Sequence, residues 1–75
     1  MSLTIDVLPR DGAFTDDLIQ AALRALRHGS IGVSAAAIIL HGTRTYLRIV
    51  PEREAHCQSA ISILVGFPLK PMNDS

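Results

Sequence analysis

The stretch from Val33 to Val50 constrains the fold more than any other part of the chain. Its first part, residues 33–40, is a nearly continuous apolar run, and its second part, residues 43–50, alternates between polar and apolar residues. A short apolar run bounded by glycine is typical of a strand covered on both sides, and alternation with a period of two indicates a strand with one wet face. His41 and Gly42 separate the two parts, and glycine suits a two-residue turn. The sequence therefore predicts a β-hairpin.

The length of the turn decides which side chains share a face of this hairpin. If His41 and Gly42 form the loop, Leu40 lies opposite Thr43 and the pairing continues from there. Three pairs are then expected on one face: Ile39 with Arg44, Ala37 with Tyr46, and Ala35 with Arg48. A four-residue loop keeps the same faces, whereas a three-residue loop exchanges them.

Length and composition predict one small cytoplasmic domain that oligomerises or binds a protein partner. A chain of 75 residues buries only ~60% of the surface that it exposes when unfolded, so its stability margin is thin. Hydrophobic residues make up 48% of the chain and charged residues 19%, which favours oligomerisation or a protein partner. A single cysteine suits a reducing compartment, and no stretch has the pattern of a membrane helix or a secretory signal. Seven basic and seven acidic residues balance, which disfavours nucleic acid and anionic membranes as partners.

Three further elements follow from local patterns. Residues 3–8 alternate as a strand that Pro9 ends, and residues 15–28 form a helix that Thr15 caps and Gly29 terminates. A second helix is expected over residues 51–65, because proline and glutamates suit its first turn. Two prolines in residues 67–72 exclude this tail from a central strand and leave it as an edge or an extended arm.

This order predicts an α+β fold, a two-layer β-α-β-β-α sandwich that is half ferredoxin-like, with two helices on one face of a small mixed sheet. Residues 1–70 are expected to form a single compact domain and residues 71–75 a short flexible tail. Ten residues are predicted to be buried together: Ile5, Val7, Leu18, Leu23, Leu26, Ile38, Leu47, Ile49, Ile61 and Leu64.

The uncovered face of the sheet carries the best candidate binding site. Arg44, Tyr46 and Arg48 form a stripe there, beside an apolar column that contains Ala37 and Ile39. Such a stripe is most often an ordinary solvated face; it also suits a protein contact, and arginines with an aromatic ring can bind phosphates and stack a base. The apolar column with its polar rim favours a protein contact over nucleic acid.

Other chemistry has weaker support. Glu52 and His56 lie one helical turn apart with Cys57 adjacent, but Cys57 belongs to the apolar stripe, so we expect no metal site. Pairing of Cys57 with a histidine as a nucleophile has no supporting motif, and a structural thiol is expected. The spacing of Ala25 and Gly29 suits a helix-turn-helix, but Gly32 and the following apolar run do not fit its second helix.

The sequence thus predicts no enzyme, no cofactor and no metal. It predicts a small non-catalytic interaction or regulatory protein, an adaptor or inhibitor, that acts through its exposed sheet face; the alternative is a nucleic-acid or phosphate-ligand module that uses the Arg/Tyr stripe. We expect a homodimer or a protein partner on that face rather than on a sheet edge, because Pro9 and Pro68 suit edge protection. The sequence does not name the partner or the process.

Overall fold

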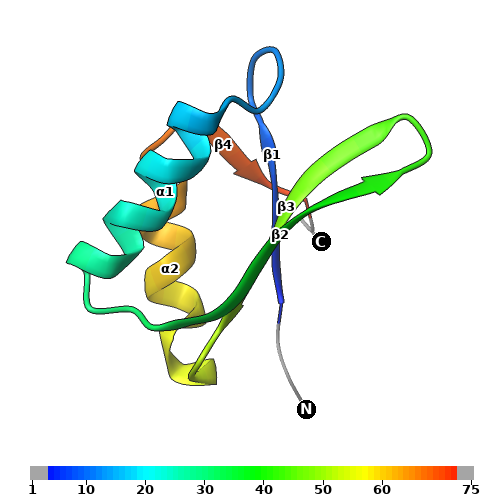
Figure 1. Ribbon diagram of the computed structural model, residues 1–75. Helices are drawn as coiled ribbons and strands as arrows, with labels where there is room; N and C mark the ends of the chain where they lie inside the picture. Colours follow the sequence, from blue (N-terminus) through cyan, green and yellow to red (C-terminus); the bar gives the residue numbers. More distant parts are fainter. Residues whose placement is uncertain (1–3, 73–75) are drawn as a thin grey trace.

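Two helices and a four-stranded sheet make up residues 4–72, which the computed structural model of the protein describes. Figure 1 shows these elements in chain order. Their bounds are β1 Ile5–Pro9, α1 Asp16–His28, β2 Val33–His41, β3 Arg44–Pro51, the 3-10 turn η1 Glu54–His56, α2 Cys57–Leu64 and β4 Leu69–Pro71. Leu3, which was predicted to begin the first strand, lies outside the described residues.

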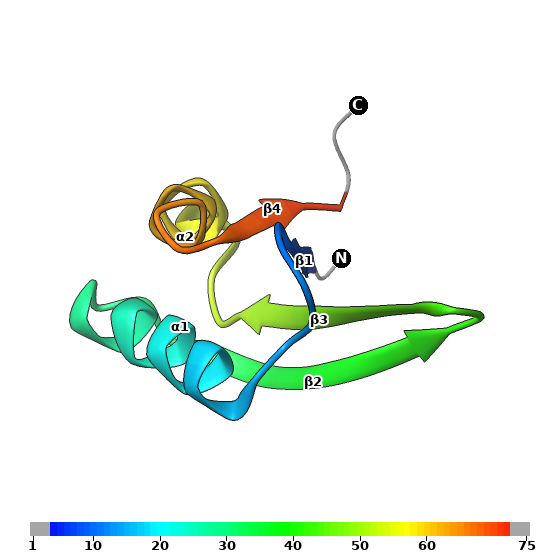
Figure 2. The same cartoon turned by 90° about the horizontal axis from the view of Figure 1, so that it is seen from above.

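The strands lie in the order β2-β3-β1-β4, with both helices on one side of the sheet (Figures 1 and 2). The predicted α+β sandwich is therefore confirmed. One detail differs, because every strand pair is antiparallel and the sheet is not mixed. The connection through α1 carries the chain past one position in the sheet, so β3 lies between β1 and β2, and β4 joins β1 on its other side.

The first helix forms as its capping residues predict. Thr15 is the N-cap, and its Oγ1 accepts a hydrogen bond from the amide of Leu18 at 3.1 Å. At the other end the left-handed residue is Ser30, with φ of 61°, and not Gly29, which was expected to end the helix. The Ile31 amide donates to the Leu26 carbonyl at 3.0 Å, which is the pattern of a Schellman motif with serine at the position that usually holds glycine.

The second helix is shorter than predicted. Pro51 ends β3, opposite Val33, and the Glu52 amide donates to the Gly32 carbonyl at 2.9 Å, so the strand pairing continues past the expected helix start. The pairing shifts register between Val33 and Ala35, and proline is tolerated beside such a bulge. The chain then forms η1 before α2 begins at Cys57.

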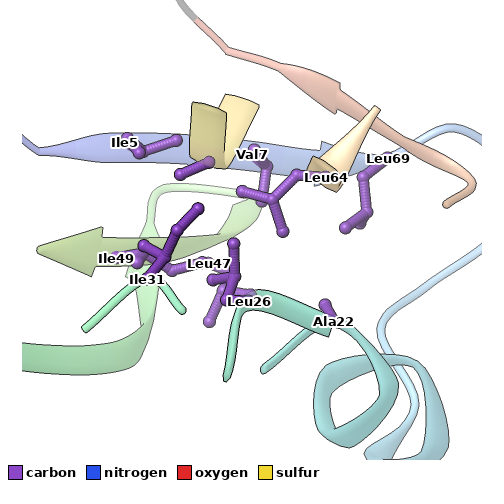
Figure 3. Packing of buried hydrophobic residues seen from close by; sticks show 10 residues of the cluster. Ile5, Val7, Ala22, Leu26, Ile31, Leu47, Ile49, Leu64 and Leu69 are labelled. Atoms are coloured by element: carbon purple, nitrogen blue, oxygen red, sulfur yellow. The ribbon is translucent and has the colours of Figure 1, made fainter. Parts of the chain in front are cut away.

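The core lies between the helices and the inner strands (Figure 3). Six of the predicted core residues are buried there, and Leu18, Leu23 and Ile61 pack against them partly buried. Ile38 is the exception, with 43% of its surface exposed, because its part of the hairpin extends away from both helices (Figures 1 and 2). The core residues that the prediction omitted are Ala22, Ile31, Ala60 and Leu69.

The chain end after α2 forms the short edge strand β4. Leu69 pairs with Pro9, and Pro71 pairs with Val7, so the proline-rich segment occupies an edge, one of the two predicted options. The Met72 amide donates to the Asp6 carbonyl at 2.8 Å. Residues 71 and 72 thus pack along the sheet, although the flexible tail was predicted to begin at residue 71; residues 73–75 lie outside the described part of the chain.

Candidate functional site

The hairpin of β2 and β3 positions all five predicted site residues. Its loop is Gly42-Thr43, one residue later than predicted, and His41 pairs with Arg44. Gly42 has φ of 67° at the first loop position, which a type II′ turn reserves for glycine. The register therefore moves by two residues from the predicted one. Because a strand has a period of two, the predicted faces stay the same.

Four of the five predicted site residues form two adjacent pairs on the sheet face turned away from the helices. Ala37 lies opposite Arg48, and Ile39 lies opposite Tyr46. Arg44 lies on the same face, farther toward the turn. We call this surface the open face; its residues on β1, β2 and β3 are Asp6, Leu8, Ala35, Ala37, Ile39, His41, Arg44, Tyr46, Arg48 and Val50.

Arg48 is held in place by contacts within its own chain. Its Nε and Nη2 donate to the two carboxylate oxygens of Asp6 at 2.9 and 3.2 Å, and Nη2 also donates to the Tyr46 hydroxyl at 3.3 Å. The hydrogen bond to Asp6 raises the pKa of Arg48 above its ordinary value, so the guanidinium stays charged. Arg48 thus already has a carboxylate partner on β1 of its own chain.

Tyr46 is buried, with only 7% of its surface exposed, although its strand position predicted an exposed ring. The guanidinium carbon of Arg48 lies 5.5 Å from the ring centroid, and Ile39 lies opposite on β2. A ring covered in this way has little free surface on which a base could stack. Arg44 is the exposed member of the predicted stripe.

Strand β2 carries a second exposed surface, although its apolar sequence predicted a covered strand. Leu40 is 76% exposed, and residues 34–38 are exposed as well, so this strand carries apolar side chains into solvent on both sides of the sheet. Ile38 and Leu40 belong to the helix side, since they pair with Leu47 and Thr45. An apolar run predicts a covered strand, but the same pattern also fits an unprotected edge strand.

A hollow of about 600 Å³ lies where the hairpin leaves the rest of the fold. Phe14, Ile19, Ile38 and Thr45 contribute to its lining, together with Arg44 and Lys70. Most of its lining residues are apolar or small, and Arg44 and Lys70 are its two charged ones. The hollow thus continues the exposed apolar surface of β2 toward the start of α1.

The residues considered for metal chemistry, Glu52, His56 and Cys57, do not share one helix or strand. Within residues 4–72, no group of three or more His, Cys, Asp and Glu residues is placed to hold a metal ion. Glu52 precedes η1, so it does not share a helix with His56. Cys57 is a free thiol, partly buried against the core, and His56 Nδ1 is buried with no hydrogen-bond partner among the described residues.

Comparison with family models, curated proteins and solved structures gives no match. Within the part of the chain that the structure describes, neither α1 nor α2 has the length and apolar character needed to cross a membrane.

Proposed function

We propose that the chain is a small non-catalytic interaction or regulatory protein, an adaptor or inhibitor, whose contact surface is β2 with the adjoining open face. One observation carries this proposal: a nine-residue apolar strand lies at the edge of the sheet with its side chains exposed on both sides. Apolar edge strands of this length pair readily with another chain. A homodimer or protein partner and a cytoplasmic location belong to the same proposal.

The open face supports a protein contact better than a nucleic-acid contact. Arg48 is paired with Asp6 and Tyr46 is buried, which leaves Arg44 as the exposed part of the stripe. Strong nucleic-acid binding needs several phosphate contacts, and the net charge of the chain is zero. We therefore expect a labelled single-stranded oligonucleotide to show no binding that falls steeply with salt. Steeply salt-dependent binding that Arg44→Gln abolishes would support the nucleic-acid alternative instead.

The interaction proposal is tested by affinity capture with three baits: the wild type, Leu40→Lys and Val65→Lys. Leu40 and Val65 are both large exposed apolar residues, but Val65 lies at the end of α2, outside β2. A charge on β2 should release a specific partner, whereas the same change at Val65 should retain it. A partner that is purified and rebinds the wild type with the same variant pattern supports the proposal. A set of captured proteins that does not change with Leu40→Lys contradicts it.

A further inference from the structure

The outer side of β2 is free to accept another strand. In the order β2-β3-β1-β4, β2 has β3 on one side and no other strand of residues 4–72 on its other side. Alternate residues of an antiparallel edge strand turn their N–H and C=O groups outward. Natural edge strands are commonly protected by proline, lysine or an inward charge, and β2 contains none of these. The bulge lies at its beginning, and regular pairing with β3 runs from Ala35 to His41.

The sequence of β2 is complementary to itself when it is reversed about Ala37. An antiparallel copy centred there places Ile38 opposite Ala36, Ile39 opposite Ala35 and Leu40 opposite Ser34. Each large side chain thus meets a small one. Within the regular part of the strand, Ala35 to His41, the faces also match: Ile38 meets Ala36 on the helix side, and Ile39 meets Ala35 on the open face. His41, the strand's one ionisable residue, meets Val33 of the other copy and not its own counterpart.

An edge contact accounts for the exposed residues better than a contact through the open face. Ile38 and Leu40 are 43% and 76% exposed on the helix side, which a partner on the open face would not touch. The charged group at the centre of the open face is already paired, since Arg48 binds Asp6 of its own chain. A strand placed beside β2 contacts side chains on both sides of the sheet.

We propose that the occupant of this edge is a second copy of the chain, which pairs antiparallel with β2 about a two-fold axis through Ala37. The contact is isologous and closes as a dimer, with one sheet of eight strands in which β4 forms both outer edges. The open face remains uncovered in this dimer and is present twice, on one side of the joined sheet. The inference rests on the proposed interaction function and names the first partner of its surface.

Cysteine crosslinking tests both the edge and the register. In a Cys57→Ser background, Ala37→Cys places two thiols opposite each other on the axis, where Cα atoms about 4.5 or 5.5 Å apart suit a disulfide. Ala35→Cys is the matched control: it lies on the same face and is also exposed, but its two copies are about 13 Å apart along the strands. We expect rapid oxidation of the Ala37→Cys protein to a covalent dimer and at least a tenfold lower rate for Ala35→Cys.

Sedimentation equilibrium supplies the second measurement. A strand pairing of this length belongs to the smaller interfaces, so the wild type should be followed from about 1 µM to about 1 mM. A dimer that forms in this range, together with the crosslinking pattern, supports the inference. A wild type that stays monomeric throughout overturns it, and so does crosslinking that is as fast at Ala35→Cys or faster at Ile38→Cys.

The oligomeric state tests the self-pairing, and the Leu40 dependence of a purified partner tests the proposed function. If the wild type is monomeric but a purified partner still depends on Leu40, β2 is an interaction surface for another protein and only the self-pairing is wrong. If the dimer forms as expected but no partner depends on Leu40, the self-pairing stands and the adaptor function is contradicted.

Discussion

The two edge strands of the sheet, β4 and β2, differ in length, composition and exposure. β4 is three residues long, ends in Pro71, carries Lys70 outward and buries Leu69 completely. β2 is nine residues long, has no proline or lysine, and leaves Leu40 largely exposed. Proline and lysine are the usual protection of an edge against pairing with another chain. The chain therefore protects one edge and leaves the other available, which supports the proposed contact through β2.

The largest expected difference between the edges concerns their leucines. Leu69→Ala should lower the free energy of unfolding by ~2–5 kcal/mol, because it leaves a cavity beneath α2 and β4. Leu40→Ala should change it by less than about 0.5 kcal/mol when the protein is dilute enough to be monomeric, because a solvated side chain loses few contacts. Urea unfolding followed by circular dichroism measures both. Equal losses in the two variants would show that the distal part of β2 is covered.

The second prediction concerns a lysine placed on β2, where it should hinder strand pairing as lysine does on other edge strands. Ile38→Lys places a charge at the unprotected edge and should weaken self-association at least tenfold, which corresponds to about 1.4 kcal/mol. Lys70→Ala, on the opposite edge, should leave association unchanged because Pro71 and the shortness of β4 still limit pairing. Light scattering over a concentration series compares the two variants with the wild type. Weaker association in the Lys70→Ala protein would show that the contact lies at the β4 edge and not at the β2 edge.

Elements with strong local signals are the ones that the sequence predicts correctly. The strands that alternate and the helix that Thr15 caps are predicted correctly, because their signals are local and each strand has one buried face. The second helix is predicted too early, because Pro51 followed by glutamates suits a helix start and the bulge opposite it is not visible in the sequence. Local patterns therefore predict the elements better than their contacts.

The candidate site is predicted in its residues but not in their environment. Its faces are correct, since a turn that moves by one residue shifts the register by two. Tyr46 contacts Arg48, and Arg48 in turn pairs with Asp6, which is 42 positions away in the chain. Exposure of β2 depends on where the helices end relative to the hairpin, as Figure 2 shows. The pairing of Arg48 with Asp6 and the position of the helices relative to the hairpin both join segments far apart in the chain, so local patterns do not predict them.

The third prediction concerns the entry into β2. Ser30 has a left-handed backbone, which is unfavourable for a residue with a side chain, so Ser30→Gly should stabilise the fold by ~0.5–1 kcal/mol. The substitution lies outside β2 and should leave self-association unchanged. Thermal unfolding and sedimentation of the same sample separate the two effects. A Ser30→Gly protein that is less stable than the wild type would show that the serine side chain contributes more than the strain costs.

The smallest expected effect on stability comes from Arg48, which belongs to a row of paired residues that crosses the open face from β2 to β4. Ala37 of β2 pairs with Arg48 of β3, Arg48 pairs with Asp6 of β1, and the Asp6 carbonyl accepts the amide of Met72 after β4. The side chains of Arg48 and Asp6 are 40% and 11% exposed, so solvent and salt weaken their attraction. Arg48→Gln should therefore lower the midpoint of thermal unfolding slightly at low salt.

The salt dependence distinguishes this ion pair from simple packing. The difference between wild type and Arg48→Gln should shrink as salt is added, because screening removes the ionic part and leaves the contact with the Tyr46 ring. Arg44→Gln is the control, since no ion pair of Arg44 is present within residues 4–72 and its variant should show no comparable trend. A difference that stays constant with salt would mean that Arg48 acts by covering Tyr46. In that case the ion pair with Asp6 only orients the guanidinium. Packing of Arg48 on the Tyr46 ring, and not ionic attraction, would then stabilise the row of residues between the two edges.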